Sequence, residues 1–216
     1  MNNYRELILV LITIGGLFTA GGSMLQFMSE QNKQTACASH LKELAQMGFQ
    51  YQNDHDGYFQ PMIVRKRTWE YWPQYLKPYA KDFIHFSCPA DSLRGAGAFE
   101  VDELLPRFYN SGYISYGMNY YLSDSGEKHM KSWPCNIKKV INPAYVVYFG
   151  DSLTAQLRPT SCWNQDHNPV HQNNSANYVM LDGHVENHSQ KTLGLVAPVK
   201  GWKYDRVRWV NWKKDK

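Results

Sequence analysis

Six side chains in the C-terminal third are of the types that bind catalytic metal ions. They are Asp151, His167, His171, Asp182, His184 and His188. Imidazole nitrogens and carboxylates hold the zinc of metal-dependent hydrolases. Pro169, however, disfavours the regular helix that would bring His167 and His171 together. His184 and His188 on one strand would be about 13 Å apart. The spacing leaves a metal-dependent hydrolase as the weakest alternative, with no catalytic or metal-binding residue assigned.

Four cysteines form a second set of reactive groups: Cys37, Cys88, Cys135 and Cys162. They lie too far apart in sequence for the paired Cys-x-x-Cys arms of a zinc site. In an oxidising compartment they could form two disulfides, and the sequence does not choose among the three connectivities. In a reducing compartment they would remain thiols.

The predicted turns also contain residues that could bind a calcium ion. Asp54, Asp56, Asp151 and Asp182 all lie in predicted turns or at strand ends. Carboxylates and carbonyls can converge on a hard cation at such places. The alternative is that these residues form Asx turns that bind no ion.

The element that must position these groups begins with an apolar run from Leu7 to Leu25 that contains no charged residue. A helix of this length spans about 30 Å of hydrocarbon. With Arg5 before the run, the positive-inside rule favours a cytoplasmic N-terminus and a head outside. A cleavable secretory signal, cut within the small residues 19–23, is the alternative.

Helical character continues past the apolar run. No proline occurs in residues 31–52, and apolar or small residues recur at steps of three and four: Cys37, Leu41, Leu44, Gly48 and Tyr51. The apolar run and the stripe of apolar or small residues that follows it therefore predict one helix over about residues 4–52, about 70 Å long. It should end in the turn-forming residues 53–57.

The head is predicted to be rich in β-structure. Strands are expected within residues 114–122, with a bulge or close backbone approach at Gly117 or Asn119, and over 144–150. A hairpin is expected from residues 177–181 through Asp182-Gly183 to 184–186. Residues 68–79 should form a short helix or irregular element whose aromatic side chains belong to the core.

Several segments in order resemble the prepilin-type H-X9-DG family of pseudopilin-like proteins, related to type IV pilins and type II secretion pseudopilins. They are Cys37–Leu44, Tyr51–Phe59, Cys88–Asp91, Ser115–Asn119, Phe149–Ser152 and Ala176–Val185. The resemblance spans about residues 30–190. The family motif maps onto His171, Asn177, Asp182, Gly183 and His184. Ten residues separate His171 from Asp182, so either His171 is the motif histidine with one inserted residue, or Gln172 replaces it.

The N-terminus is similar to the family only in part. Members begin with a basic leader, a glycine and a phenylalanine, and carry a glutamate five residues into the processed, N-methylated chain. Here Met1–Arg5 contain no such leader, and Glu6 lies where the family glutamate would. The resemblance implies that Glu6 pairs with the terminal amine of a neighbouring subunit. The other interpretation is a charge that stabilises the helix N-terminus.

The resemblance implies an α+β, pilin-like fold in which a long N-terminal helix packs on an antiparallel β-sheet head with long loops. Residues 1–52 would form the helix and 53–216 the head. It implies a structural or assembly role in the bacterial envelope, within a type II secretion or pilus-like system. The protein would be a single-pass inner-membrane protein with its head in the periplasm or outside. Its partners would be the membrane and copies of itself or other pseudopilins.

Composition excludes some functions and leaves one further alternative. The net charge of +4 is modest, with a basic excess near the C-terminus that is no signature of nucleic-acid binding. No Walker loop, dinucleotide fingerprint or Gly-x-Ser-x-Gly motif is present. The aromatic and charged residues of 201–213 suit an edge strand or a polysaccharide-binding surface. An anchored or secreted ligand-binding module is therefore the alternative to assembly.

Overall fold

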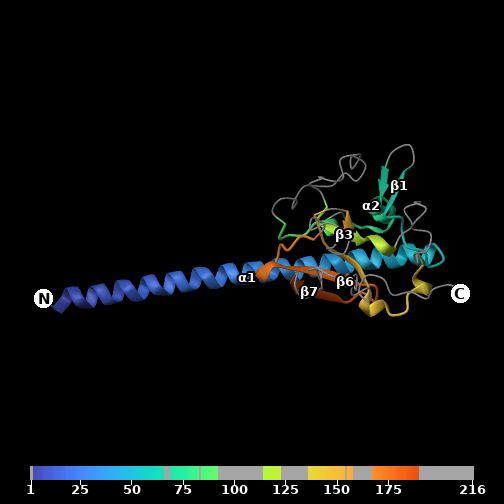
Figure 1. Ribbon diagram of the computed structural model, residues 1–216. Coiled ribbons are helices and arrows are strands. Elements are labelled where there is room, and N and C mark those ends of the chain that lie inside the picture. Colours follow the sequence, from blue (N-terminus) through green and yellow to red (C-terminus); the bar gives the residue numbers. More distant parts are fainter. Residues whose placement is uncertain are drawn as a thin grey trace, which may run out of the picture.

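The computed structural model describes residues 2–65, 69–82, 84–91, 114–122, 136–153, 155–157 and 167–189, with side chains from Met24 onward except in 63–70. One long helix, α1 (Asn2–Asp54), precedes a small head. Figure 1 shows α1 extending away from the head at its N-terminal end and running along the sheet at its C-terminal end. The protein is thus α+β, with the predicted N-terminal helix.

The turn after α1 ends the helix at the predicted place. The Gly57 N–H donates to the Gln52 carbonyl oxygen at 2.7 Å. Gly57 has φ +86° and Asp56 has φ 54°. A left-handed conformation of this kind terminates many helices and favours glycine. The predicted turn at residues 53–57 is confirmed.

The head contains two sheets. A two-stranded sheet pairs β1 (Ile63–Arg65) with β2 (Trp69–Tyr71). The larger sheet has the order β5-β3-β4-β6-β7. Its strands are β3 (Tyr116–Asn119), β4 (Val147–Asp151), β5 (Gln156–Leu157), β6 (Ser175–Met180) and β7 (Val185–Ser189).

The larger sheet is mixed rather than wholly antiparallel. β3, β4, β6 and β7 pair antiparallel, but β5 joins the edge parallel to β3, with Met118 opposite Gln156. The prediction of an antiparallel sheet is wrong at this edge. A bulge or close backbone approach is expected from the sequence at Gly117 or Asn119. β3 pairs regularly with β4 through Gly117, and the shift in strand register lies instead in β4, between Val147 and Phe149.

Short helices connect the strands. They are α2 (Trp72–Leu76), η1 (Lys77–Tyr79), η2 (Ile84–Phe86), η4 (Tyr120–Leu122), η6 (Ile137–Lys139), η7 (Pro143–Tyr145) and η8 (Gln172–Asn174). The predicted short helix within residues 68–79 is present as α2 and η1, but the start of that range forms the strand β2. Of the aromatic residues expected in the core, Tyr71 and Trp72 are buried there, whereas Tyr75 and Tyr79 are half-buried and pack against it.

The core lies between α1 and the sheet. All five residues of the predicted helical stripe are buried: Cys37, Leu41, Leu44, Gly48 and Tyr51. This part of α1 packs on β4 and β6, while Tyr51 packs against Tyr75 and Tyr79. From the sheet, Tyr148 and Val179 fill the same layer. The C-terminal part of α1 is thus the central element of the head's core.

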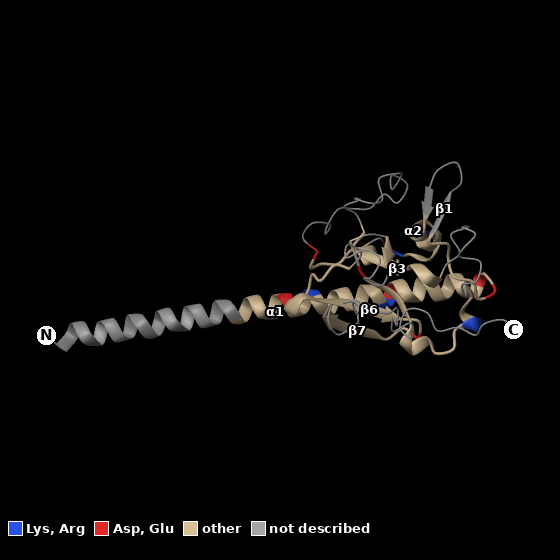
Figure 2. Cartoon of the chain, viewed as in Figure 1, with Lys and Arg blue, Asp and Glu red and all other residues tan. Residues whose placement is uncertain are grey.

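The outer part of α1 differs in character. Met24, Leu25, Phe27 and Met28 are exposed, by 52–70%. Figure 2 shows this uncharged stretch ahead of the first charged positions in the described part of the helix. Among the residues whose side chains the structure describes, which in α1 begin at Met24, none of the helices has the length and apolar character of a membrane span.

Candidate functional site

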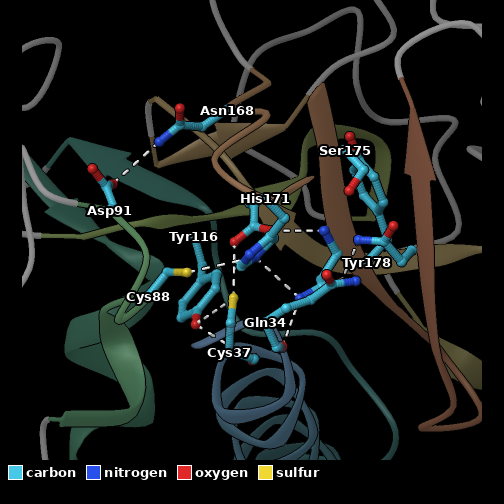
Figure 3. Close-up of polar contacts among 12 residues, drawn as sticks. Gln34, Cys37, Cys88, Asp91, Tyr116, Asn168, His171, Ser175 and Tyr178 are labelled. Atoms are coloured by element: carbon cyan, nitrogen blue, oxygen red, sulfur yellow. Dashed lines mark hydrogen bonds and ion pairs between the residues drawn. The ribbon is translucent and has the colours of Figure 1, made fainter. Parts of the chain in front are cut away.

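Four buried side chains meet where α1 crosses the sheet: Cys37, Cys88, Asp151 and His171. Each offers one ligand-type atom, and these atoms all lie within 4.8 Å of one another. Figure 3 shows Cys37 on α1, with Cys88 and His171 approaching from two other segments. Among the described residues this is the one group of three or more such side chains that could hold a metal ion.

Each of the four residues is positioned by a different element. Cys37 belongs to the buried stripe of α1. Cys88 follows η2, and its carbonyl oxygen accepts a hydrogen bond from the Asp91 N–H at 3.0 Å. Asp151 is the last residue of β4 and pairs with Tyr116. His171 precedes β6, and its N–H donates to the Ser175 carbonyl oxygen at 3.1 Å.

The side chains are in direct polar contact. Cys37 Sγ donates to Asp151 Oδ1 at 3.1 Å. His171 Nε2 lies 3.1 Å from Asp151 Oδ2 and 3.6 Å from Cys88 Sγ. Cys37, Cys88 and Asp151 have no exposed surface, and the His171 side chain is 1% exposed. The cluster is therefore closed to solvent.

A second layer of polar groups orients the cluster. The Tyr116 hydroxyl lies 3.1 Å from Cys37 Sγ, and the Asn177 N–H donates to Asp151 Oδ2 at 2.6 Å. The Asn177 side-chain amide donates to the Gln34 carbonyl oxygen of α1 at 3.2 Å and accepts from Asn187 Nδ2 at 2.8 Å. Asn177 therefore links α1, β6 and β7 beside the cluster.

Burial and charge shift the protonation of these groups in opposite directions. Burial lowers the pKa of His171, but its hydrogen bonds to Asp151 and Cys88 outweigh burial and raise it to about 9. A hydrogen bond from Cys37 lowers the pKa of Cys88 to about 7, against the effect of burial. Burial raises the pKa of Cys37 well above its usual value. Without a cation, the arrangement favours a Cys88 thiolate beside a His171 imidazolium.

The contacts do not form a nucleophilic relay. In such a relay one ring nitrogen of histidine faces the nucleophile and the other faces the carboxylate. Here Cys88 and Asp151 both contact Nε2 of His171. The buried Nδ1 has no hydrogen-bond partner among the described residues. What the set can do is hold a cation, because two thiolates, an imidazole and a carboxylate are common zinc ligands.

The six residues of the C-terminal third that were considered as metal ligands do not all lie together in the structure. His171 and Asp151 meet in the cluster, whereas His167 Nδ1 lies 3.1 Å from the hydroxyl of Tyr178. Asp182 and His184 contact each other at 2.6 Å on the β6–β7 hairpin. His184 and His188 both contact Glu186, which lies between them on β7.

The predicted family-motif residues have clear structural places. Asp182 and Gly183 form the turn of the predicted β6–β7 hairpin, with Gly183 at φ +91°. The His184 N–H donates to Asp182 Oδ1 at 3.1 Å, as in an Asx turn. His171 and Asn177, by contrast, belong to the buried cluster and the layer around it.

The four aspartates considered for calcium do not converge. Asp54 accepts a hydrogen bond from the Tyr79 hydroxyl at 3.0 Å, and Asp56 lies in the turn after α1. Asp151 is buried and Asp182 is on the hairpin turn. Among the described residues they form no shared group of three or more ligand atoms.

Sequence reasoning named all four members of the cluster but did not group them. No local spacing connects them, since each comes from a separate segment. The available signal was position: Cys37 lies on the buried stripe, Cys88 opens a Cys-Pro turn and Asp151 ends a buried strand. Cys37 and Cys88 are free thiols in the structure. The other predicted disulfide residues, Cys135 and Cys162, the Glu6 side chain and residues 201–213 lie outside the described residues.

Comparison with protein-family models, with curated proteins and with solved structures finds no match. The resemblance to the H-X9-DG family therefore stays a prediction.

Proposed function

We propose that this chain is a pseudopilin-like structural subunit of the bacterial envelope, held in the membrane and to neighbouring subunits by the N-terminal part of α1. The observation that carries the proposal is the change along this one helix. At Cys37, Leu41 and Leu44 it is completely buried in the head. At Leu25 and Phe27 the same helix presents large apolar side chains that are 70% and 53% exposed.

The exposed apolar side chains on the outer part of α1 would be more stable in contact with lipid or with another protein. A contiguous apolar segment beyond a folded head is typical of sites that meet lipid or another protein. The apolar run from Leu7 to Leu25 adjoins it in sequence and has the length of a membrane span. The first charged residues after this run are Glu30 and Lys33, whose side chains form an ion pair at 2.9 Å. The pattern suits a lipid or subunit boundary just before the head.

The proposed assembly places the head in the periplasm or outside and gives it a structural role, without catalysis. Glu6 would face the terminal amine of the next subunit, where low dielectric would strengthen the pair. Self-association would then depend on the outer part of α1 rather than on the head.

The test compares two lysine substitutions in the native host. Met28→Lys lies on the outer part of α1, where Met28 is 52% exposed, and Ile141→Lys lies on the head, where Ile141 is 55% exposed. Chemical cross-linking in intact membranes should give ladders of oligomers for the wild type and for Ile141→Lys, but not for Met28→Lys. A monomer in all three, or equal loss in both variants, would refute assembly through α1.

The N-terminus provides an independent check. Mass spectrometry of the protein from native-host membranes should find a processed and methylated N-terminus shortly before the apolar run. Release of a soluble head by cutting within residues 19–23 would favour the ligand-binding module instead.

A further inference from the structure

We propose that Cys37, Cys88, Asp151 and His171 bind one divalent cation of the zinc class, with one ligand atom each, and that this ion fastens α1 to the head. The proposal stands apart from the assembly function, since it concerns the interior of a single chain. Two sulfurs, one imidazole nitrogen and one carboxylate oxygen match the ligand types and the number of a tetrahedral zinc site.

The spacing of the ligand atoms fits such an ion. With Zn–S of about 2.3 Å and Zn–N of about 2.0–2.1 Å, tetrahedral angles place a sulfur about 3.5 Å from a nitrogen. The Cys88 Sγ to His171 Nε2 distance is 3.6 Å. A nitrogen and an oxygen ligand would lie about 3.3 Å apart, and His171 Nε2 to Asp151 Oδ2 is 3.1 Å. The remaining distances between ligand atoms are at most 4.8 Å, so side-chain shifts of up to about 1 Å would complete the site.

The polar neighbours of His171 Nε2 also favour a bound cation. Nε2 faces the carboxylate of Asp151 at 3.1 Å and the side-chain amide nitrogen of Asn177, also at 3.1 Å. The Asn177 amide is oriented, because its oxygen accepts from Asn187 and its nitrogen donates to Gln34. One ring nitrogen cannot serve an acceptor and a donor at once. A cation between Nε2 and the carboxylate attracts the lone pairs of both.

The charge balance of the cluster is compatible with a bound cation. Besides His171 and Cys37, the Asp151 carboxylate is bonded only to the Asn177 N–H among the described residues. A buried carboxylate needs a positive partner, which His171 supplies when it is protonated and a bound cation would supply when His171 is a neutral ligand. The Tyr116 hydroxyl, 3.1 Å from Cys37 Sγ, is placed to stabilise a thiolate. Such outer hydrogen bonds are typical around bound metals.

The ligand set selects both the ion and its role. Calcium requires six to eight oxygen ligands, which two sulfurs and a nitrogen do not supply. Four protein ligands in a closed site leave no open position for substrate, so the ion would be structural. It would join α1, the segment after η2, β4 and the segment before β6 at a single point.

The first test is metal content of the full chain, purified without chelator or added reductant. We expect about one zinc per chain. His171→Gln should lose it, while His167→Gln, which changes another buried histidine of the same region, should keep it. Equal zinc in both variants, or no zinc in the wild type, would overturn the proposal.

The second test does not depend on a variant that folds. The wild-type chain, reduced and freed of metal, is titrated with Co²⁺. Tetrahedral thiolate ligation should appear as sulfur-to-cobalt charge-transfer absorption with strong visible bands, saturating at one equivalent. Weak octahedral bands would refute the site. So would a native chain in which Cys37 and Cys88 form a disulfide, shown by a mass lower by two hydrogens and resistance of both residues to alkylation.

Discussion

Gly48 of α1 lies against the ring of Tyr148 of β4, so closely that a Cβ on residue 48 would be 2.1 Å from Tyr148 Oη. The ring cannot move away easily. Its hydroxyl donates to Gln60 Oε1 at 2.7 Å and accepts from Gln52 Nε2 at 3.0 Å. This contact sets how closely the helix approaches the sheet.

Gly48→Ala should therefore destabilise the protein, although alanine normally stabilises a helix relative to glycine by about 1 kcal/mol. Overpacking should lower the free energy of unfolding by about 1–3 kcal/mol. Denaturant unfolding measures it. Gln46→Ala, at an exposed position two residues away, is the control and should be nearly neutral. Stabilisation by Gly48→Ala would show that α1 is not packed this tightly.

Trp72 should be a second point of sensitivity. Its ring packs on Phe86 and Phe149, and its Nε1 donates to the Ala155 carbonyl oxygen at 2.8 Å. Trp72→Phe removes the hydrogen bond and leaves space, with an expected cost of about 1–3 kcal/mol in unfolding free energy. Tyr58→Phe, at a side chain 55% exposed, should change it by less than about 0.5 kcal/mol. Equal effects would contradict the assigned core.

Substitution of Gly183 by alanine tests whether the Asp-Gly motif acts as a turn. At φ +91° an alanine would be strained, while the nearest atom to its Cβ would be Phe49 Cε2 at an ordinary 3.5 Å. The cost should come from the backbone alone, about 1–2 kcal/mol in thermal or denaturant unfolding. Gly183→Asn should cost less, because asparagine tolerates left-handed conformations better. An unchanged stability with lost assembly would assign the motif a role in contacts.

His184 should titrate above the ordinary histidine pKa of about 6.5. Partial burial lowers its pKa, but hydrogen bonds to Glu186 at 3.1 Å and Asp182 at 2.6 Å raise it further than burial lowers it. The stabilisation is then complete below about pH 6.5 and is lost as pH rises through the folded-state pKa. Its size should be small, since the side chain is 42% exposed.

An NMR titration of the His184 ring protons measures this pKa directly. Asp182→Asn should lower it, because one of the two carboxylates that favour the imidazolium is removed. His188 also contacts Glu186, so the ring signals of the two histidines must be assigned separately. A His184 pKa at or below the ordinary value would contradict the contacts of the hairpin.

Local patterns were enough to predict the elements that carry strong periodicity or turn residues. The stripe from Cys37 to Tyr51 predicted the buried face of α1, and Asp182-Gly183 predicted the hairpin. The parallel strand β5 was not predictable, because Gln156–Leu157 is too short to show alternation. The cluster was missed because its members meet only after separate elements pack, and local spacing carries no information about such contacts.

The use of one helix for both the outer arm and the centre of the core has a mechanical consequence. α1 runs as a single helix from Asn2 to Asp54, with no proline inside it. There is no linker to absorb rotation. A pull or twist on the arm would be transmitted along the helix axis to Cys37, Leu41 and Leu44, and so to the sheet packed around them.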